Sequence, residues 1–214
     1  MSVAAVVVAG GQGVRFGGPK QFAGFGDETV AERSVRTARC VASRVVLVVP
    51  ESYDGGGEGA DVVVTGGTSR AESVRAGLLA CADADIVVVH DAARPLATSA
   101  LFHAVVNAVS AGADAAIPGL AVTDTVKRVR KDDEATVVVE TVPRGDLVTV
   151  QTPQAFRRDI LESAHANSDD ATDDAALVEA LGGRVVVVAG EIDNIKITQP
   201  GDLKKVTSFA RSGQ

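Results

Sequence analysis

Short apolar runs rich in β-branched residues alternate with longer amphipathic segments along most of the 214-residue chain. The runs lack a strict alternation of apolar and polar positions, which is typical of strands buried on both faces of a parallel sheet. Strands are therefore predicted at residues 3–9, 45–49, 62–65, 86–90, 115–118 and 185–189.

The segments between these runs place apolar residues three or four positions apart, as on one face of a helix. The predicted core-facing residues are Ala31, Val35, Ala38 and Ala42, then Val74, Leu78 and Cys81, and then Leu101, Val105 and Ala108. Parallel strands joined by crossover helices predict a single three-layer α/β domain over residues 1–214, with ligands bound at the carboxyl ends of the strands.

Capping residues mark where several helices begin. Ser69 and Glu72 predict a capping box for the second helix, and Thr98 predicts an N-cap for the third. Thr172, followed by Asp173 and Asp174, predicts a further helix that ends at the glycines 182–183.

One segment departs from the α/β pattern. Residues 125–131 alternate apolar and polar side chains, 132–135 are polar, and 136–142 are again rich in β-branched residues. This predicts a protruding hairpin, taken as a β-arm over 124–146. Because an isolated hairpin is marginally stable in water, we expect the arm to rest on a second subunit in a homodimer.

The composition argues against nucleic acids and membranes as binding partners. With a net charge of −7 and an isoelectric point near 5.0, the chain lacks the broad basic surface that binding to nucleic acids or anionic membranes requires. No apolar run approaches the roughly 18 residues of a membrane span, and the apolar start has no basic region before it. Cys40 and Cys81 stand singly, which predicts two reduced, buried thiols and a cytoplasmic location.

The candidate chemistry begins where the first predicted strand ends. Residues 9–21, AGGQGVRFGGPKQ, combine five glycines with Arg15 and Lys20, which predicts a loop that binds phosphate through backbone N–H groups. A solvated, mobile loop is the alternative. Phe16 breaks the dinucleotide fingerprint, and Pro19 and Gln21 break the P-loop pattern.

Four more clusters lie at or just past predicted strand ends: GGTSRAES at 66–73, HDAARP at 90–95, TPQAF at 152–156 and DNIKIT at 193–198. In this order, with the glycine loop, VTDTVKRV at 122–129 and TVPR at 141–144, the chain resembles the 2-C-methyl-D-erythritol 4-phosphate cytidylyltransferases of the non-mevalonate isoprenoid pathway. The resemblance covers nearly the whole chain. Val8 and Gly10 depart from the commoner pattern, the spacer from Arg15 to Pro19 is short, and the Ala-Gly-Gly start also occurs in the sister ribitol-5-phosphate cytidylyltransferases.

The resemblance implies a Rossmann-like nucleotidyltransferase fold and a reaction between CTP and 2-C-methyl-D-erythritol 4-phosphate that releases pyrophosphate. The acceptor's phosphate oxygen is already ionised when it attacks the α-phosphorus. No general base is therefore needed, and catalysis rests on positioning and on stabilising negative charge.

The resemblance also assigns roles to individual residues. The cations with a catalytic role are Arg15, Lys20, Arg144 and Lys196. The nucleotide-binding positions are Ala9, Gly10, Gly11, Gly13, Gly67, Arg70, Ser73, Asp91 and Ala92. The acceptor-binding positions are Arg94, Thr125, Thr152 and Thr172, and Asp91 is the candidate ligand of Mg²⁺. In the family the arm crosses the dimer, which implies an acceptor site completed by the second subunit.

Structural roles compete with several of these assignments. Arg70 and Ser73 could be surface residues of a capped helix, Lys196 a solvated lysine at a strand edge, and Thr172 an N-cap alone. His90, at a buried strand end, is interpreted as a hydrogen-bonded structural histidine, and His103 and His165 are given no chemical role.

Three other functions are weighed against methylerythritol phosphate cytidylyl transfer. One is cytidylyl transfer to ribitol 5-phosphate, and another is a nucleotide-binding sensor without catalysis, which the presence of Arg15, Lys20 and Lys196 disfavours. The third is NAD binding, which Phe16 and the lack of an acidic residue after the second predicted strand disfavour.

Overall fold

A computed structural model describes residues 1–11, 16–81, 83–166 and 173–212. Its centre is a sheet of eight strands in the order β10, β7, β11, β6, β1, β4, β5, with β12 beside β7. The strands are β1 (Val3–Val8), β4 (Arg44–Val49), β5 (Val62–Thr65), β6 (Ile86–Asp91), β7 (Ala115–Ala121), β10 (Val148–Val150), β11 (Gln154–Arg157) and β12 (Val185–Ala189). All six predicted strands are confirmed within a few residues.

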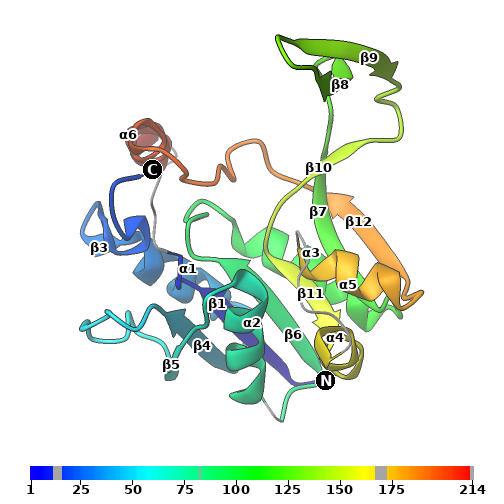
Figure 1. The fold of residues 1–214 in the computed structure, drawn as a ribbon. Coiled ribbons are helices and arrows are strands. Elements are labelled where there is room, and N and C mark those ends of the chain that lie inside the picture. Colours follow the sequence, from blue (N-terminus) through cyan, green and yellow to red (C-terminus); the bar gives the residue numbers. More distant parts are fainter. Residues whose placement is uncertain (12–15, 82, 167–172, 213–214) are drawn as a thin grey trace.

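Helices cover both faces of this sheet (Figure 1). Helices α1 (Val30–Ala38) and α3 (Ser99–Ser110) bury their apolar sides on one face against Ala5, Val7 and Leu47. On the other face, Val6 and Val48 pack with α2 (Arg70–Leu79), α4 (Arg158–Ala166) and α5 (Asp174–Ala180). The predicted α/β fold with a mostly parallel sheet is confirmed.

The helix starts follow the predicted caps in two of three cases. Ser69 and Glu72 form the capping box of α2, and the Thr98 side chain accepts a hydrogen bond from the N–H of Leu101 in α3. For α5 the prediction was wrong, because Asp173 is the N-cap and accepts from the N–H of Ala176. Thr172 lies outside the described residues.

The cluster at 152–156 lies at the start of a strand, whereas the sequence predicted a place at or just past a strand end. It leads into β11, which runs antiparallel to β6 and β7, so its amino end, rather than its carboxyl end, meets the carboxyl end of β6. Because β11 runs in the opposite direction, this cluster lies at the carboxyl edge of the parallel strands although it precedes its own strand. The sequence did not predict β11, whereas α4 is the helix on which it placed His165.

Cys40 also departs from expectation. It follows the end of α1 in a turn and is exposed, whereas Cys81 is buried as predicted, and both are free cysteines. Burial raises the pKa of the Cys81 thiol to about 11. Among the described residues, no helix is both long and apolar enough to cross a membrane.

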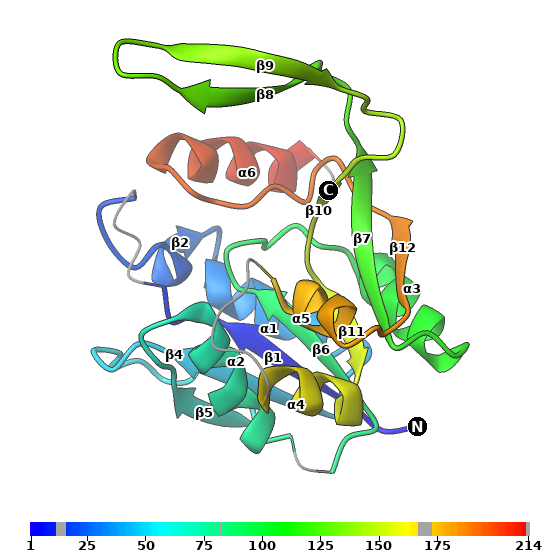
Figure 2. The ribbon, with the colours of Figure 1, turned by 45° about the vertical axis from the view of Figure 1, so that its right-hand side comes forward.

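The predicted hairpin is present as β8 (Val126–Lys131) and β9 (Thr136–Val142), which form a separate two-stranded sheet within the described part of the chain. It stands clear of the main sheet in both views (Figures 1 and 2). Val129, Val138 and Val139 are each more than half exposed on it. A small sheet of β2 (Gly24–Phe25) and β3 (Glu28–Thr29), the 3-10 helix η1 (Lys20–Phe22) and α6 (Pro200–Ser212) complete the chain.

Helix α2 packs on β1 and β4 through Gly77, where a methyl group would overlap the Val6 and Val48 side chains. We therefore expect Gly77→Ala to destabilise the protein by about 1–3 kcal/mol in urea unfolding, although alanine favours helices. The control is Gly201→Ala in α6, where the added methyl group meets open space. Equal unfolding midpoints for the two variants would contradict the close packing of α2.

Candidate active site

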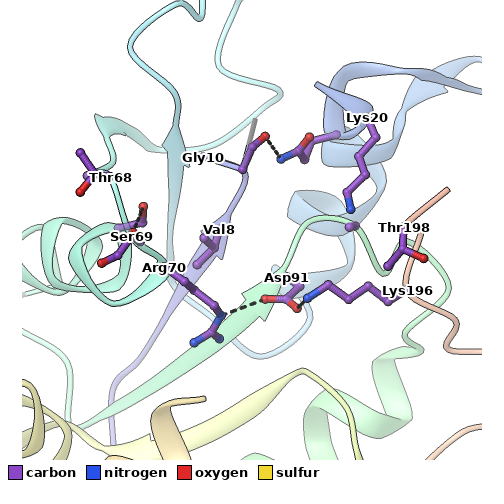
Figure 3. A pocket seen from close by; sticks show the side chains of 14 residues that line it. Val8, Gly10, Lys20, Thr68, Ser69, Arg70, Asp91, Lys196 and Thr198 are labelled. Carbon is purple, nitrogen blue, oxygen red and sulfur yellow. Dashed lines mark hydrogen bonds and ion pairs between the residues drawn. The ribbon is translucent and has the colours of Figure 1, made fainter. Parts of the chain in front are cut away.

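A pocket of about 360 Å³ opens where β1 and β6 end and α2 begins (Figure 3). We call it the glycine-loop pocket. Its lining residues are Val8, Gly10, Gly11, Lys20, Gln21, Gly67, Thr68, Ser69, Arg70, Ser73, Asp91, Ala93, Lys196 and Thr198. Four clusters singled out in the sequence thus meet in one place, at the carboxyl edge of the sheet where ligands of such folds bind.

Gln21 holds the first residues of the glycine loop in place. Its amide nitrogen donates to the carbonyl oxygens of Ala9, at 2.9 Å, and Gly11, at 2.8 Å, and the side chain is 3% exposed. Because the Ala9 carbonyl points to Gln21, the N–H of Gly10 across the same trans peptide points the opposite way. Sequence reasoning missed this role, since a glutamine after a lysine is usually solvated.

Lys20 comes from η1 and lines the same pocket. Gly10 and Gly11 lie beside it, while Ala9 is fully buried and is not among the lining residues. Gly13 and Arg15 lie outside the described residues.

The segment 66–73 forms the opposite wall. Its capping box fixes the start of α2, and Ser73, 3% exposed, donates from Oγ to the carbonyl oxygen of Ser69 at 3.0 Å. Gly67 lies where a Cβ would overlap Glu72, so this tight entry needs a glycine. Ser73 and Arg70 both line the pocket, and neither is a solvated surface residue.

Asp91 ends the central strand β6 and lies between two cations. Its Oδ1 is 3.4 Å from Nε of Arg70, and its Oδ2 is 2.6 Å from Nζ of Lys196. Burial would raise the pKa of Asp91, but the charges of Lys196 and Arg70 outweigh burial and hold that pKa well below its usual range. The pocket therefore holds a carboxylate that is ionised at neutral pH. Lys196 is exposed, but its ammonium group pairs with Asp91 and lines the pocket, which favours the predicted role in the site over that of a solvated edge lysine.

His90 is a structural histidine, as interpreted from the sequence. The ring is fully buried, its Nδ1 is 3.2 Å from Oγ1 of Thr152, and it lies 5.0 Å from the Phe102 ring. Burial lowers the pKa of His90 to about 4, so the side chain is neutral at pH 7. His103 is exposed on α3.

A second pocket of about 190 Å³ adjoins the first. We call it the Thr152 pocket. It is lined by Arg70, Asp91, Arg94, Val150, Gln151, Thr152, Gln154, Asp173 and Lys196. Arg70, Asp91 and Lys196 line both pockets and so form the boundary between them.

Two of the residues predicted to bind the acceptor, Arg94 and Thr152, line this second pocket. Arg94 donates from Nη1 to the Asn194 carbonyl oxygen at 2.7 Å, which directs its guanidinium across the 193–198 segment. The Oγ1 of Thr152 accepts from the Asp91 N–H at 3.0 Å, and the Thr152 side chain is buried. Thr152 thus orients Asp91 while lining the pocket.

The remaining predicted residues lie elsewhere. Thr125 and Arg144 are exposed near the base of the arm, Arg144 donates to the Thr123 carbonyl oxygen, and neither residue lines the two pockets. Ala92 is fully buried behind Asp91, where its carbonyl oxygen accepts from the Ser34 hydroxyl, and Ala93 lines the pocket instead.

The glycine-loop pocket offers a metal ion few side-chain ligands among the described residues. Among the described residues no group of three or more His, Cys, Asp or Glu side chains is placed to hold a metal, and Asp91 is the one carboxylate that lines the glycine-loop pocket. Mg²⁺ is commonly held by one or two carboxylates together with substrate phosphates. A single ionised carboxylate fits that mode of binding.

Comparisons with known proteins agree with one another. The family model of 2-C-methyl-D-erythritol 4-phosphate cytidylyltransferase matches residues 3–211. A protein of that name from Rhodococcus jostii is 44% identical over 99% of this chain and 96% of its own length. A bifunctional IspD/IspF enzyme from an Anaeromyxobacter species is 45% identical over 97% of this chain, which spans 57% of that relative. The crystal structure of the enzyme from Thermus thermophilus superposes with a TM-score of 0.84 at 36% identity, covering 99% of this chain and all of that one.

Proposed function

The chain belongs to the 2-C-methyl-D-erythritol 4-phosphate cytidylyltransferase family, and on this premise we propose that it joins CTP and 2-C-methyl-D-erythritol 4-phosphate. The products are 4-diphosphocytidyl-2-C-methyl-D-erythritol, an isoprenoid precursor, and pyrophosphate. The observation that carries the proposal is the shared boundary of Arg70, Asp91 and Lys196 between two adjoining pockets. This arrangement lets two phosphorylated substrates meet at one wall.

CTP occupies the glycine-loop pocket in this proposal. Its phosphates lie against the backbone of Gly10 and Gly11 and beside Lys20, and its base lies toward the segment 66–73. Backbone N–H groups without a neighbouring Cβ are suited to this close approach.

The acceptor occupies the Thr152 pocket, where Arg94 and Lys196 supply positive charge for its phosphate. A phosphate oxygen of the acceptor forms the new bond to the α-phosphorus of CTP, and the bond from that phosphorus to the bridging oxygen breaks. Pyrophosphate leaves with the electron pair of the broken bond. No side chain has to remove a proton, so the cations contribute by position and charge.

Mg²⁺ is the proposed cofactor, with Asp91 as its protein ligand and the nucleotide's phosphates as the others. The support for this is the ionised state of Asp91 inside the pocket. When bound, the ion neutralises charge on the triphosphate.

A homodimer formed through the arm is also proposed. The support is the exposed valines on an unpaired two-stranded sheet, which bury little apolar surface within one subunit. A second subunit that covers them would also place an arm, with Thr125 and Arg144 near its base, next to another site.

Measuring pyrophosphate release tests the function. With CTP and Mg²⁺ we expect turnover on 2-C-methyl-D-erythritol 4-phosphate and much weaker turnover on ribitol 5-phosphate, with loss of activity when EDTA removes the metal. Preference for ribitol 5-phosphate would assign the chain to the sister activity. Tight CTP binding without turnover on either acceptor would indicate a sensor.

Lys20→Ala separates transition-state stabilisation from simple attraction. If Lys20 stabilises charge that develops on the phosphates, we expect kcat to fall about 100-fold or more while CTP affinity changes less than about 10-fold. Lys204→Ala, at an exposed lysine of α6, is the matched control and should keep the parent rate. Losses of equal size in affinity and turnover would contradict the assigned role.

Sedimentation velocity tests the dimer. The parent chain should sediment as a dimer at micromolar concentration, and Val138→Lys, at a valine that is 60% exposed on the arm, should shift it toward monomer with loss of activity. Leu79→Lys, at an exposed leucine that ends α2, should leave the mass unchanged. A monomeric parent chain would refute the proposal.

A further inference from the structure

A buried carboxylate lies beyond Arg70, outside both substrate pockets. Asp174 is 1% exposed, and its Oδ2 is 2.8 Å from Nη1 of Arg70. Its Oδ1 is 3.0 Å from Nε2 of His165, which is itself 4% exposed on α4. Asp174 is not among the lining residues of either pocket, and its side chain meets the wall of the site at Arg70.

The position of Asp174 is fixed by the start of a helix. It is the first residue of α5, directly after the N-cap Asp173, and α4 and α5 pack on the same face of the sheet. A carboxylate in the first turn is favoured by the helix dipole. Burial nevertheless makes it a costly residue to keep, because an ion pair removed from water adds little net stability.

Arg70 is therefore held between two carboxylates from different parts of the fold. Asp91 contacts Nε and Asp174 contacts Nη1, two different edges of one planar group. Burial would lower the pKa of Arg70, but the charges of Asp174 and Asp91 outweigh burial and raise it. Two anchors fix the plane of the guanidinium, whereas one would allow it to turn.

We propose that Asp174, supported by His165, is a positioning residue that sets the orientation of Arg70 at the boundary between the two pockets. The inference rests on the proposed function, since Arg70 is taken to face the bound nucleotide. A continuous row of contacts joins His165 to Asp174, Asp174 to Arg70, Arg70 to Asp91, and Asp91 to Lys196. A substitution at Asp174 or His165 would therefore alter the charged residues at the boundary between the two pockets.

A double-mutant cycle on CTP affinity tests the proposal. Asp174→Asn keeps the shape and removes the charge of the ion pair with Arg70, and we expect it to weaken CTP binding about 10-fold in calorimetry. In the Arg70→Gln background the same change should alter CTP affinity less than about 2-fold, because the guanidinium that Asp174 contacts is absent. A purely structural role would give additive losses, which would overturn the inference.

The controls separate folding from function. Asp159→Asn makes the same change at an exposed carboxylate in the first turn of α4 and should leave CTP affinity unchanged. If Asp174→Asn does not fold, His165→Gln replaces it. That variant should weaken CTP binding in the parent chain and not in the Arg70→Gln background, and equal losses in both would also overturn the inference.

A ligand-free readout keeps the inference independent of the proposed reaction. In nitrogen-15 NMR spectra, a guanidinium held by two carboxylates rotates slowly and gives separate Nη signals, and we expect these for Arg70 in the parent chain and their merging in Asp174→Asn. Identical Arg70 signals in both would refute the positioning role. If the parent chain neither binds CTP nor turns over, the proposed function fails while these spectra still decide the role of Asp174.

Discussion

The buried negative charge of Asp91 is the constraint on which the site depends. A carboxylate at the end of a central strand is costly unless cations and hydrogen-bond donors surround it. Arg70 comes from 21 residues before it, Thr152 from 61 residues after it and Lys196 from 105 residues after it. One charge therefore fixes the relative placement of α2, the segment before β11 and the segment before α6. The same contacts that stabilise Asp91 bring the two pockets to a common wall.

That wall is positively charged in a protein whose net charge is −7. Around the two pockets, Lys20, Arg70, Arg94 and Lys196 outnumber the carboxylates Asp91 and Asp173. The acidic remainder of the chain keeps long polyanions away, while a concave, local excess of cations favours small phosphorylated ligands. Charge distribution, more than net charge, agrees with a nucleotide and a sugar phosphate as substrates.

The sequence predicted the elements whose patterns are local. The parallel strands, the capping box of α2, the N-cap of α3 and the arm follow from periodicity and from short motifs, and the motif clusters located the pocket. It missed β11, because a short strand that reverses direction has no pattern of its own, and it placed Cys40 in the core although the helix ends before it. The roles of Gln21, Asp174 and His165 were also missed. Each depends on a partner that only the fold brings near, so no spacing along the chain could reveal them.

The arm and the site are linked by the same physical reasoning. The family resemblance implies that Thr125 binds the acceptor and that Arg144 has a catalytic role, yet within one subunit both lie near the base of the arm and neither lines the Thr152 pocket. That pocket already has Arg94 and Lys196, and its volume is only about 190 Å³. A hairpin with exposed valines needs a partner surface, and the proposed acceptor site, which lacks Thr125 and Arg144 within one subunit, needs residues from an arm. Under the proposed dimer a single contact supplies both, so the stability of the arm and the completion of the acceptor site would have the same cause.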